Sequence, residues 1–219
     1  MTQTSFKEIS GLDGVYQARA GKLYCTALRL RNGGFCLYSP VAGLEKNSDD
    51  LFPDPAAVSV LLSPNHYHNK GLNGHAKAFP NATLVCSEKA KPRLNEITGL
   101  SFQSLSTLSQ QLNDNQSLLE PQGLKTGEIW VQVETDADLA WIVTDAFSAA
   151  LHPPGTDAYE PTMLKTFPRY GVKDASVFTD WVNEQIAIAR PTILLSCHGS
   201  PVRSPDLGTQ LTGLLTTTL

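Results

Sequence analysis

The sequence predicts an α/β fold of two mixed β-sheets stacked face to face, with helices on the two outer faces: a four-layer αββα sandwich. The first observation is order. Each half of the chain begins with strand-like segments and continues with alternating helix and strand signals. The second observation is continuity. No stretch with the composition of a linker separates the halves, so residues 1–219 are expected to form a single domain.

The first half carries a hairpin signal and a buried strand. Arg-Asn-Gly-Gly at 31–34 joins two apolar segments and favours a tight turn. The apolar run at 58–62 is typical of a buried strand, which Ser63-Pro64-Asn65 ends. The Ser-, Gln- and Asn-rich segment that leads to residue 116 is expected to be loop or weak helix. The other expected elements are strands at 15–18, 23–30, 34–38 and 82–86, and helices at about 70–78 and 87–95.

The second half repeats this order. Strands at 129–133 and 139–143 flank a polar segment and predict a second hairpin, and a long loop runs from 153 to about 173. Asp174 is a plausible N-cap for a helix at 175–189, which Pro191 follows. A strand at 192–196 comes next. Ser204-Pro205 is expected to start a last helix.

Composition excludes several classes of protein. The formal net charge of −4 argues against a nucleic-acid-binding surface. The N-terminus lacks the pattern of a secretory signal, and no apolar stretch is long enough to span a membrane. The cysteines form no C-x-x-C pair and are expected to be reduced and buried, which favours a cytoplasmic protein: Cys25, Cys36, Cys86 and Cys197.

Three of the five histidines, with one aspartate, follow predicted strands. His66 and His68 come after the strand at 58–62, Asp145 after 139–143 and His198 after 192–196. In an H-x-H pair on an extended segment both side chains point to one face, because strand side chains alternate. We therefore expect these four residues to converge as a site for zinc or iron(II), although isolated histidines after strands are often only hydrogen-bonded loop residues.

The segment around these histidines resembles the metallo-β-lactamase-fold superfamily. Its members carry H-x-H-x-D-H followed by x-G-G on a loop after a buried strand. Residues 66–74 read His-Tyr-His-Asn-Lys-Gly-Leu-Asn-Gly, so the first two histidines and the last glycine match. Lys70 stands in place of the Asp, and Gly71 in place of the third His.

Three later landmarks extend the resemblance from about residue 15 to 201. The family sequence G-H-x-P-G-S is matched at both glycines, Gly123 and Gly127, whereas Leu124 replaces the metal-binding His. Asp145 matches the aspartate that bridges two metals in the family, and His198-Gly199 matches its last His-Gly.

The resemblance implies a degenerate metal site. His66, His68 and Asp145 remain for the first metal, whereas the second metal keeps only Asp145 and His198. Lys70 would place a positive charge beside the second site, or would pair with Asp145 in place of a cation. We therefore expect at most one metal ion per chain. We also expect Leu124→His to tighten the first site, and a second metal to need Lys70→Asp with Gly71→His.

Two functions follow from these residues. The first is a divergent hydrolase in which one zinc or iron ion, held by His66, His68 and Asp145, activates water, with His198 and Lys70 as further catalytic candidates. The resemblance implies an ester, thioester, amide or phosphoester substrate. The second is an inactive member of the fold that binds no metal and uses the old cleft for a small ligand or a protein partner.

The remaining candidates are weaker. A Cys197-His198 nucleophile is disfavoured because adjacent residues on a strand point opposite ways. His152 is a possible replacement ligand, while His75 is expected at the surface or in packing. Trp130, Trp141 and Trp181 are expected in the core. The loop at 152–173 either covers the cleft or is a structural insertion.

Overall fold

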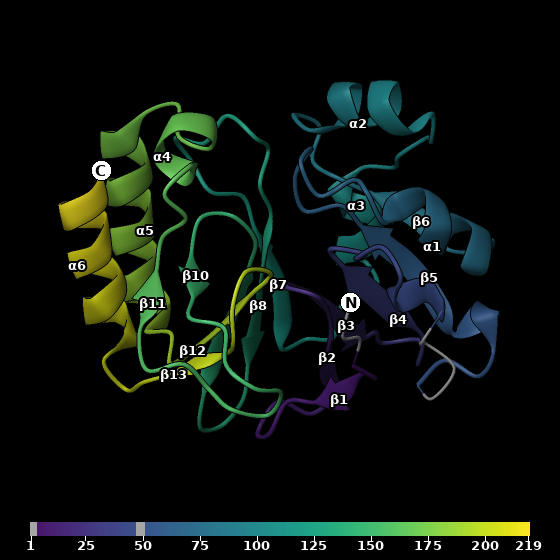
Figure 1. Cartoon of the computed structure of the whole chain (residues 1–219), viewed down its shortest axis with the longest axis horizontal. Coiled ribbons are helices and arrows are strands. Elements are labelled where there is room, and N and C mark those ends of the chain that lie inside the picture. Colours follow the sequence, from purple (N-terminus) through teal and green to yellow (C-terminus); the bar gives the residue numbers. More distant parts are fainter. Residues whose placement is uncertain (1–3, 47–50) are drawn as a thin grey trace. The chain divides into compact units, whose positions relative to one another are not determined.

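The computed structural model describes residues 4–46 and 51–219. The chain divides into two compact units, an N-terminal unit (Met1–Asn115) and a C-terminal unit (Gln116–Leu219). Each unit contains one main β-sheet together with helices of its own (Figure 1).

The N-terminal unit contains a mixed six-stranded sheet with the order β1-β2-β3-β4-β5-β6. Strands β1 to β4 pair antiparallel, and β4, β5 and β6 pair parallel. The predicted turn between β3 and β4 is present: Gly33 has a φ of 83°, and the Asn32 side chain accepts a hydrogen bond from Gly34 N at 2.9 Å. The elements are β1 (Lys7–Glu8), β2 (Val15–Ala20), β3 (Leu23–Arg29), β4 (Phe35–Tyr38), η1 (Leu44–Lys46), η2 (Pro55–Ala57), β5 (Val58–Leu62), α1 (Leu72–Ala78), β6 (Thr83–Val85), α2 (Lys91–Thr98) and α3 (Leu105–Ser109).

The C-terminal unit contains a five-stranded sheet with the order β13-β12-β9-β8-β7. Strands β9 and β12 are parallel neighbours, and the other pairs of this sheet are antiparallel. Strands β10 and β11 form a separate two-stranded sheet. The elements are β7 (Gln116–Leu119), β8 (Trp130–Glu134), β9 (Leu139–Val143), β10 (Ser148–Ala149), β11 (Pro161–Thr162), α4 (Phe167–Tyr170), α5 (Ala175–Ala189), β12 (Ile193–Ser196), β13 (Val202–Arg203) and α6 (Leu207–Thr218).

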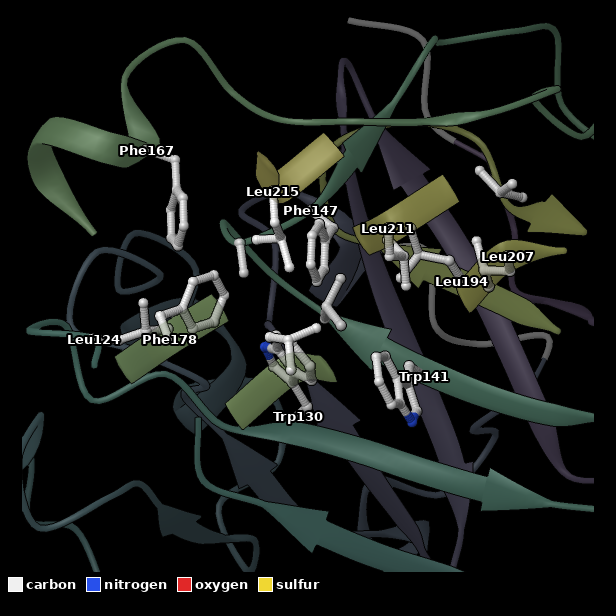
Figure 2. Packing of buried hydrophobic residues seen from close by; sticks show 14 of the residues in the cluster. Leu124, Trp130, Trp141, Phe147, Phe167, Phe178, Leu194, Leu207, Leu211 and Leu215 are labelled. Carbon is white, nitrogen blue, oxygen red and sulfur yellow. The ribbon is translucent and has the colours of Figure 1, made fainter. Parts of the chain in front are cut away.

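An aromatic cluster lies between this sheet and helices α5 and α6 (Figure 2). The ring of Trp130 lies 5.3 Å from those of Trp141 and Trp181 and 5.6 Å from that of Phe147. Asp174 caps α5 as predicted, because its side chain accepts a hydrogen bond from Val177 N. The expectation that the three tryptophans belong to the core is confirmed, with Trp181 only partly buried.

The predicted fold class of two mixed sheets with helices is confirmed. The segment before residue 116 contains α3, and β7 was not predicted at all. The long loop contains the short elements β11 and α4. All four cysteines are free and buried, as expected. Within the described residues, no helix has both the length and the apolar character needed to cross a membrane.

Candidate functional site

Asp145 and His198 lie just beyond the carboxyl ends of two adjacent parallel strands. β9 ends at Val143 and β12 at Ser196, and these two residues are register partners. The chain therefore brings Asp145 and His198 together although 53 residues separate them. Asp145 Oδ1 and His198 Nε2 lie 2.9 Å apart, and the two side chains are 16% and 24% exposed. Two of the four predicted site residues are therefore in contact within the C-terminal unit, and their role in a metal site stays a prediction.

Backbone contacts fix the position of His198. The Ser196 hydroxyl accepts a hydrogen bond from His198 N at 2.9 Å and donates one to Phe147 O at 2.6 Å. The carbonyl of His198 accepts from Ala149 N. Gly199 follows with a φ of 131°, and a Cβ there would lie 2.2 Å from Ala149 O, so this close approach requires glycine. The glycine of the His-Gly pair noted in the sequence is therefore a structural requirement of the turn.

His66 and His68 lie on a turn, and the prediction that they lie on an extended segment is wrong. Asn65 is the physical reason. Its side-chain oxygen accepts hydrogen bonds from Tyr67 N at 2.8 Å and His68 N at 3.2 Å, which folds the chain back directly after β5. The His66 ring lies beside the Tyr67 ring, with a centroid distance of 4.3 Å. Strand alternation therefore does not orient this histidine pair.

Ser39 contacts His68 directly. Its Oγ lies 2.7 Å from His68 Nδ1, and Ser39 itself is buried. Ser39 follows β4 with a φ of 56°, one of two positive φ values among the described non-glycine residues. A serine rarely adopts this left-handed conformation. The strained backbone thus coincides with the hydrogen bond that orients one candidate ligand.

Helix α1 begins at a position where a side chain cannot fit. A Cβ on Gly71 would lie 2.1 Å from Pro40 O and 2.8 Å from Ala42 N, both backbone atoms. His75 is buried one helical turn later, and its Nδ1 lies 2.9 Å from Gly71 O. His75 is thus a packing residue, as expected. The position at which family members carry a third histidine is closed by the backbone that follows β4.

Glu128 is a buried carboxylate that sequence reasoning missed. It is 2% exposed and precedes β8. Its Oε1 accepts hydrogen bonds from Trp130 Nε1 at 2.9 Å and from Thr144 N and Ala146 N at 3.3 Å each. Burial, and then the nearby Asp145 charge, raise the pKa of Glu128 to about 7. The one signal in the sequence was a carboxylate between Gly127 and the apolar segment of β8.

The other candidates have the following surroundings. Leu124 is buried in the apolar cluster of the C-terminal unit, close to Phe167 and Phe178 in Figure 2. Lys70 is exposed in the N-terminal unit. His152 donates its backbone N–H to Ser200 Oγ, and its ring lies 6.1 Å from that of Tyr159. The candidate ligands are thus His66 and His68 in one unit and Asp145 and His198 in the other, and their union in one site stays a prediction.

Comparison with known proteins gives no match by sequence: neither a family model nor a curated protein matches the chain. Solved structures match by shape. The metal-soaked Flv1 flavodiiron core from Synechocystis sp. PCC6803 has a TM-score of 0.64 at 11% identity over 97% of this chain. A flavoprotein from Thermotoga maritima has a TM-score of 0.66 at 12% identity over 99%. A metallo-β-lactamase from Hirschia baltica has a TM-score of 0.62 at 9% identity over 97%.

The lengths of these proteins differ. The chain spans 61% of the Synechocystis protein and 62% of the Thermotoga protein, but 98% of the Hirschia metallo-β-lactamase. At such low identities the likeness concerns the fold and not the activity. Together with the two mixed sheets and their helices, it shows that this chain has the metallo-β-lactamase fold.

Proposed function

We propose that the chain is a divergent hydrolase that binds at most one metal ion, zinc or iron, at the strand ends that carry Asp145 and His198. The observation that carries this proposal is the contact of 2.9 Å between the Asp145 carboxylate and the His198 imidazole. In sheets that contain parallel strands, functional groups gather beyond the carboxyl ends of those strands. In the resemblance noted above, these two positions are metal ligands.

The two residues fit a shared metal ion. Two ligand atoms that each lie about 2.1 Å from a tetrahedral zinc are separated by roughly 3.4 Å. Asp145 Oδ1 and His198 Nε2 lie 2.9 Å apart, about half an ångström less than this separation, so the pair would have to open by that amount to admit the ion. Carboxylate and imidazole also suit iron(II), the type of metal that the name of the flavodiiron neighbours denotes.

The N-terminal unit would supply the remaining ligands. Ser39 contacts His68 at Nδ1, so His68 would bind through Nε2, as a histidine ligand with a hydrogen-bonded second nitrogen does. The family resemblance implies His66, His68 and Asp145 as the ligand set, and we propose His198 as a further ligand because it contacts Asp145. The assignment requires His68 to face the Asp145–His198 pair.

A bound metal ion would supply an activated water for attack on a carbonyl or phosphoryl centre. The residues of the chain would do the rest. The Ser196 hydroxyl accepts a hydrogen bond from His198 N and so keeps His198 in place beside Asp145 at the ends of β12 and β9. Lys70 is exposed on the loop that follows His68, and its ammonium would attract an anionic substrate. Esters, thioesters, amides and phosphoesters remain the candidate substrates.

Metal content tests the proposal. The purified chain is dialysed against zinc or iron(II) and then against buffer, and the retained metal is measured. We expect up to one equivalent, a clear reduction in His68→Ala, Asp145→Asn and His198→Ala, and no reduction in Asp180→Asn, which changes an exposed aspartate of α5. Two retained equivalents that depend on these ligands would refute the argument for a single site.

One observation favours a second function. Asp145 and His198 already form a hydrogen bond with each other, so the Asp145 carboxylate has a partner without a metal ion. The chain would then bind a small ligand or a protein partner and would have lost hydrolysis. Zero retained metal, together with no turnover of ester, thioester or phosphoester substrates, would select this alternative.

A further inference from the structure

Glu128 accepts hydrogen bonds from the backbone of the segment that carries Asp145. The N–H groups of Thr144 and Ala146 both donate to Glu128 Oε1 at 3.3 Å, and these two residues flank Asp145 on either side. Trp130 Nε1 donates to the same oxygen at 2.9 Å, which fixes the carboxylate against the start of β8. One oxygen atom therefore holds the backbone on both sides of a candidate ligand.

The other oxygen of Glu128 makes none of these hydrogen bonds. Among the described residues, Glu128 Oε2 and Thr126 Oγ1 are buried side-chain atoms without a hydrogen-bond partner. Burial of a carboxylate with an unpaired oxygen is unfavourable, and an amide would accept the same three hydrogen bonds without a charge. The negative Asp145 side chain lies close enough to raise the pKa of Glu128 further. The feature that matters for the backbone around Asp145 is therefore the oxygen that accepts three hydrogen bonds, and not the charge.

We propose that Glu128 is a positioning residue for Asp145. Its carboxylate fixes the backbone from Thr144 to Ala146, and this aims the Asp145 carboxylate at His198 Nε2. The proposal goes beyond the proposed function, because every bond in it lies within the C-terminal unit and none involves a metal ion. It rests on the proposed function only for the importance of Asp145 to the activity.

The test uses the full chain, freed of metal by a chelator and labelled with ¹⁵N at histidine. Long-range proton–nitrogen NMR spectra at about pH 8.5, where an ordinary imidazole is neutral, report which ring nitrogen carries the proton. His198 signals are assigned by their loss in His198→Asn. In the unaltered chain we expect the Nε2–H tautomer, held by Asp145. In Glu128→Ala we expect a mixture of both tautomers, because the Asp145 carboxylate is no longer held in contact with His198 Nε2.

Two variants separate positioning from loss of structure. Glu128→Gln keeps an oxygen that can accept all three N–H bonds, so we expect it to retain the Nε2–H tautomer. Glu128→Asp keeps the charge but is one methylene shorter, so we expect the mixture; it also replaces Glu128→Ala if that variant does not fold. Glu120→Ala changes an exposed glutamate of the same unit and should leave the spectrum unchanged.

The outcomes are distinct. An unchanged His198 tautomer in Glu128→Ala and Glu128→Asp would overturn the proposal, and so would a mixture in Glu128→Gln as large as in Glu128→Asp. Because these spectra are recorded without metal, failure of the unaltered chain to bind zinc or iron would refute the proposed hydrolase and leave the positioning role intact.

Discussion

Ser39 links backbone strain to the candidate site through a single side chain. A non-glycine residue in the left-handed region costs about 1 kcal/mol or more, and it persists only when its surroundings hold it there. Here the hydroxyl of Ser39 lies 2.7 Å from His68 Nδ1. Partners of this kind orient the ring of a ligating histidine and select the nitrogen that binds.

Ser39→Ala is therefore expected to weaken metal binding more than folding. Loss of one hydrogen bond should lower the free energy of unfolding by about 1 kcal/mol. Loss of the orienting partner should weaken zinc affinity by about 10-fold or more. Isothermal titration with zinc and urea unfolding measure the two effects, with Ser101→Ala at an exposed position as the control. If Ser39→Ala and Ser101→Ala bound zinc with equal affinity, Ser39 would have no role in metal binding.

Glu128 predicts a pH dependence of stability. The pKa of its carboxyl is raised in the folded chain from 4.5 to about 7, so the folded state holds this proton more tightly than the unfolded state. The stability contributed by this proton is fully present below about pH 4.5 and is lost as pH rises to about 7. Glu128→Gln removes this titration.

Urea unfolding over this range checks the prediction. The free energy of unfolding of the unaltered chain should fall, relative to that of Glu128→Gln, between about pH 4.5 and 7 and then stay level. Parallel curves for the two proteins would mean that Glu128 ionises normally when folded.

The contact between two candidate ligands could be predicted from the sequence, whereas the local structure around the other two candidates could not. Asp145 and His198 could be predicted because residues that follow adjacent parallel strands meet at one edge. The turn at His66 and His68 could not, since it depends on which backbone N–H groups the Asn65 side chain reaches. Glu128 could not either, because two of the groups it binds lie 16 and 18 residues away in the chain.

At the scale of elements, the start of α1 leaves no room for a side chain at residue 71. Any side chain at Gly71 would collide with the carbonyl of Pro40. The expectation that Lys70→Asp with Gly71→His would create a second metal site therefore meets a steric obstacle. The expectation that Leu124→His would tighten the first metal site meets a different obstacle. The substitution would place an imidazole in the apolar cluster around Phe178.

Gly71→Ala should destabilise the chain by about 1–3 kcal/mol, the range found when a packed region must shift to admit extra atoms. Gly213→Ala is the matched control, since no atom lies within 4 Å of the added Cβ in the middle of α6. There alanine should raise stability by up to about 1 kcal/mol. Thermal unfolding of the two variants should thus shift in opposite directions; a shift in the same direction would contradict the packing described at Gly71.

Elements with strong local signals were predicted well, and weak ones were not. The helix at 175–189 has a capping residue and matches α5 at both ends. By contrast, β7 has the sequence Gln-Ser-Leu-Leu, without polar–apolar alternation, and it is a strand because it pairs with β8. The four residues of α4 are too short to give a helical period.

For the whole molecule, the sequence at the junction of the two units predicts how the chain unfolds. No stretch with the composition of a linker separates the two halves of the chain. We therefore predict that the full chain unfolds in one cooperative step as a single domain, although it contains two compact units.

Differential scanning calorimetry tests this prediction. One peak with equal calorimetric and van't Hoff enthalpies is expected for a single domain. Two resolved peaks would instead show that the N-terminal and C-terminal units are separate domains.

The parallel pairing of β9 and β12 makes the Asp145–His198 contact independent of an intact chain between them. Tyr159 is 87% exposed on the segment between these strands, so a protease specific for aromatic residues should cut there first. The hydrogen-bonded register of β9 and β12 would hold the two fragments together, so the nicked protein should elute as one species on gel filtration and keep its His198 NMR signal. Separation of the fragments would show that chain continuity, and not strand pairing, maintains the contact.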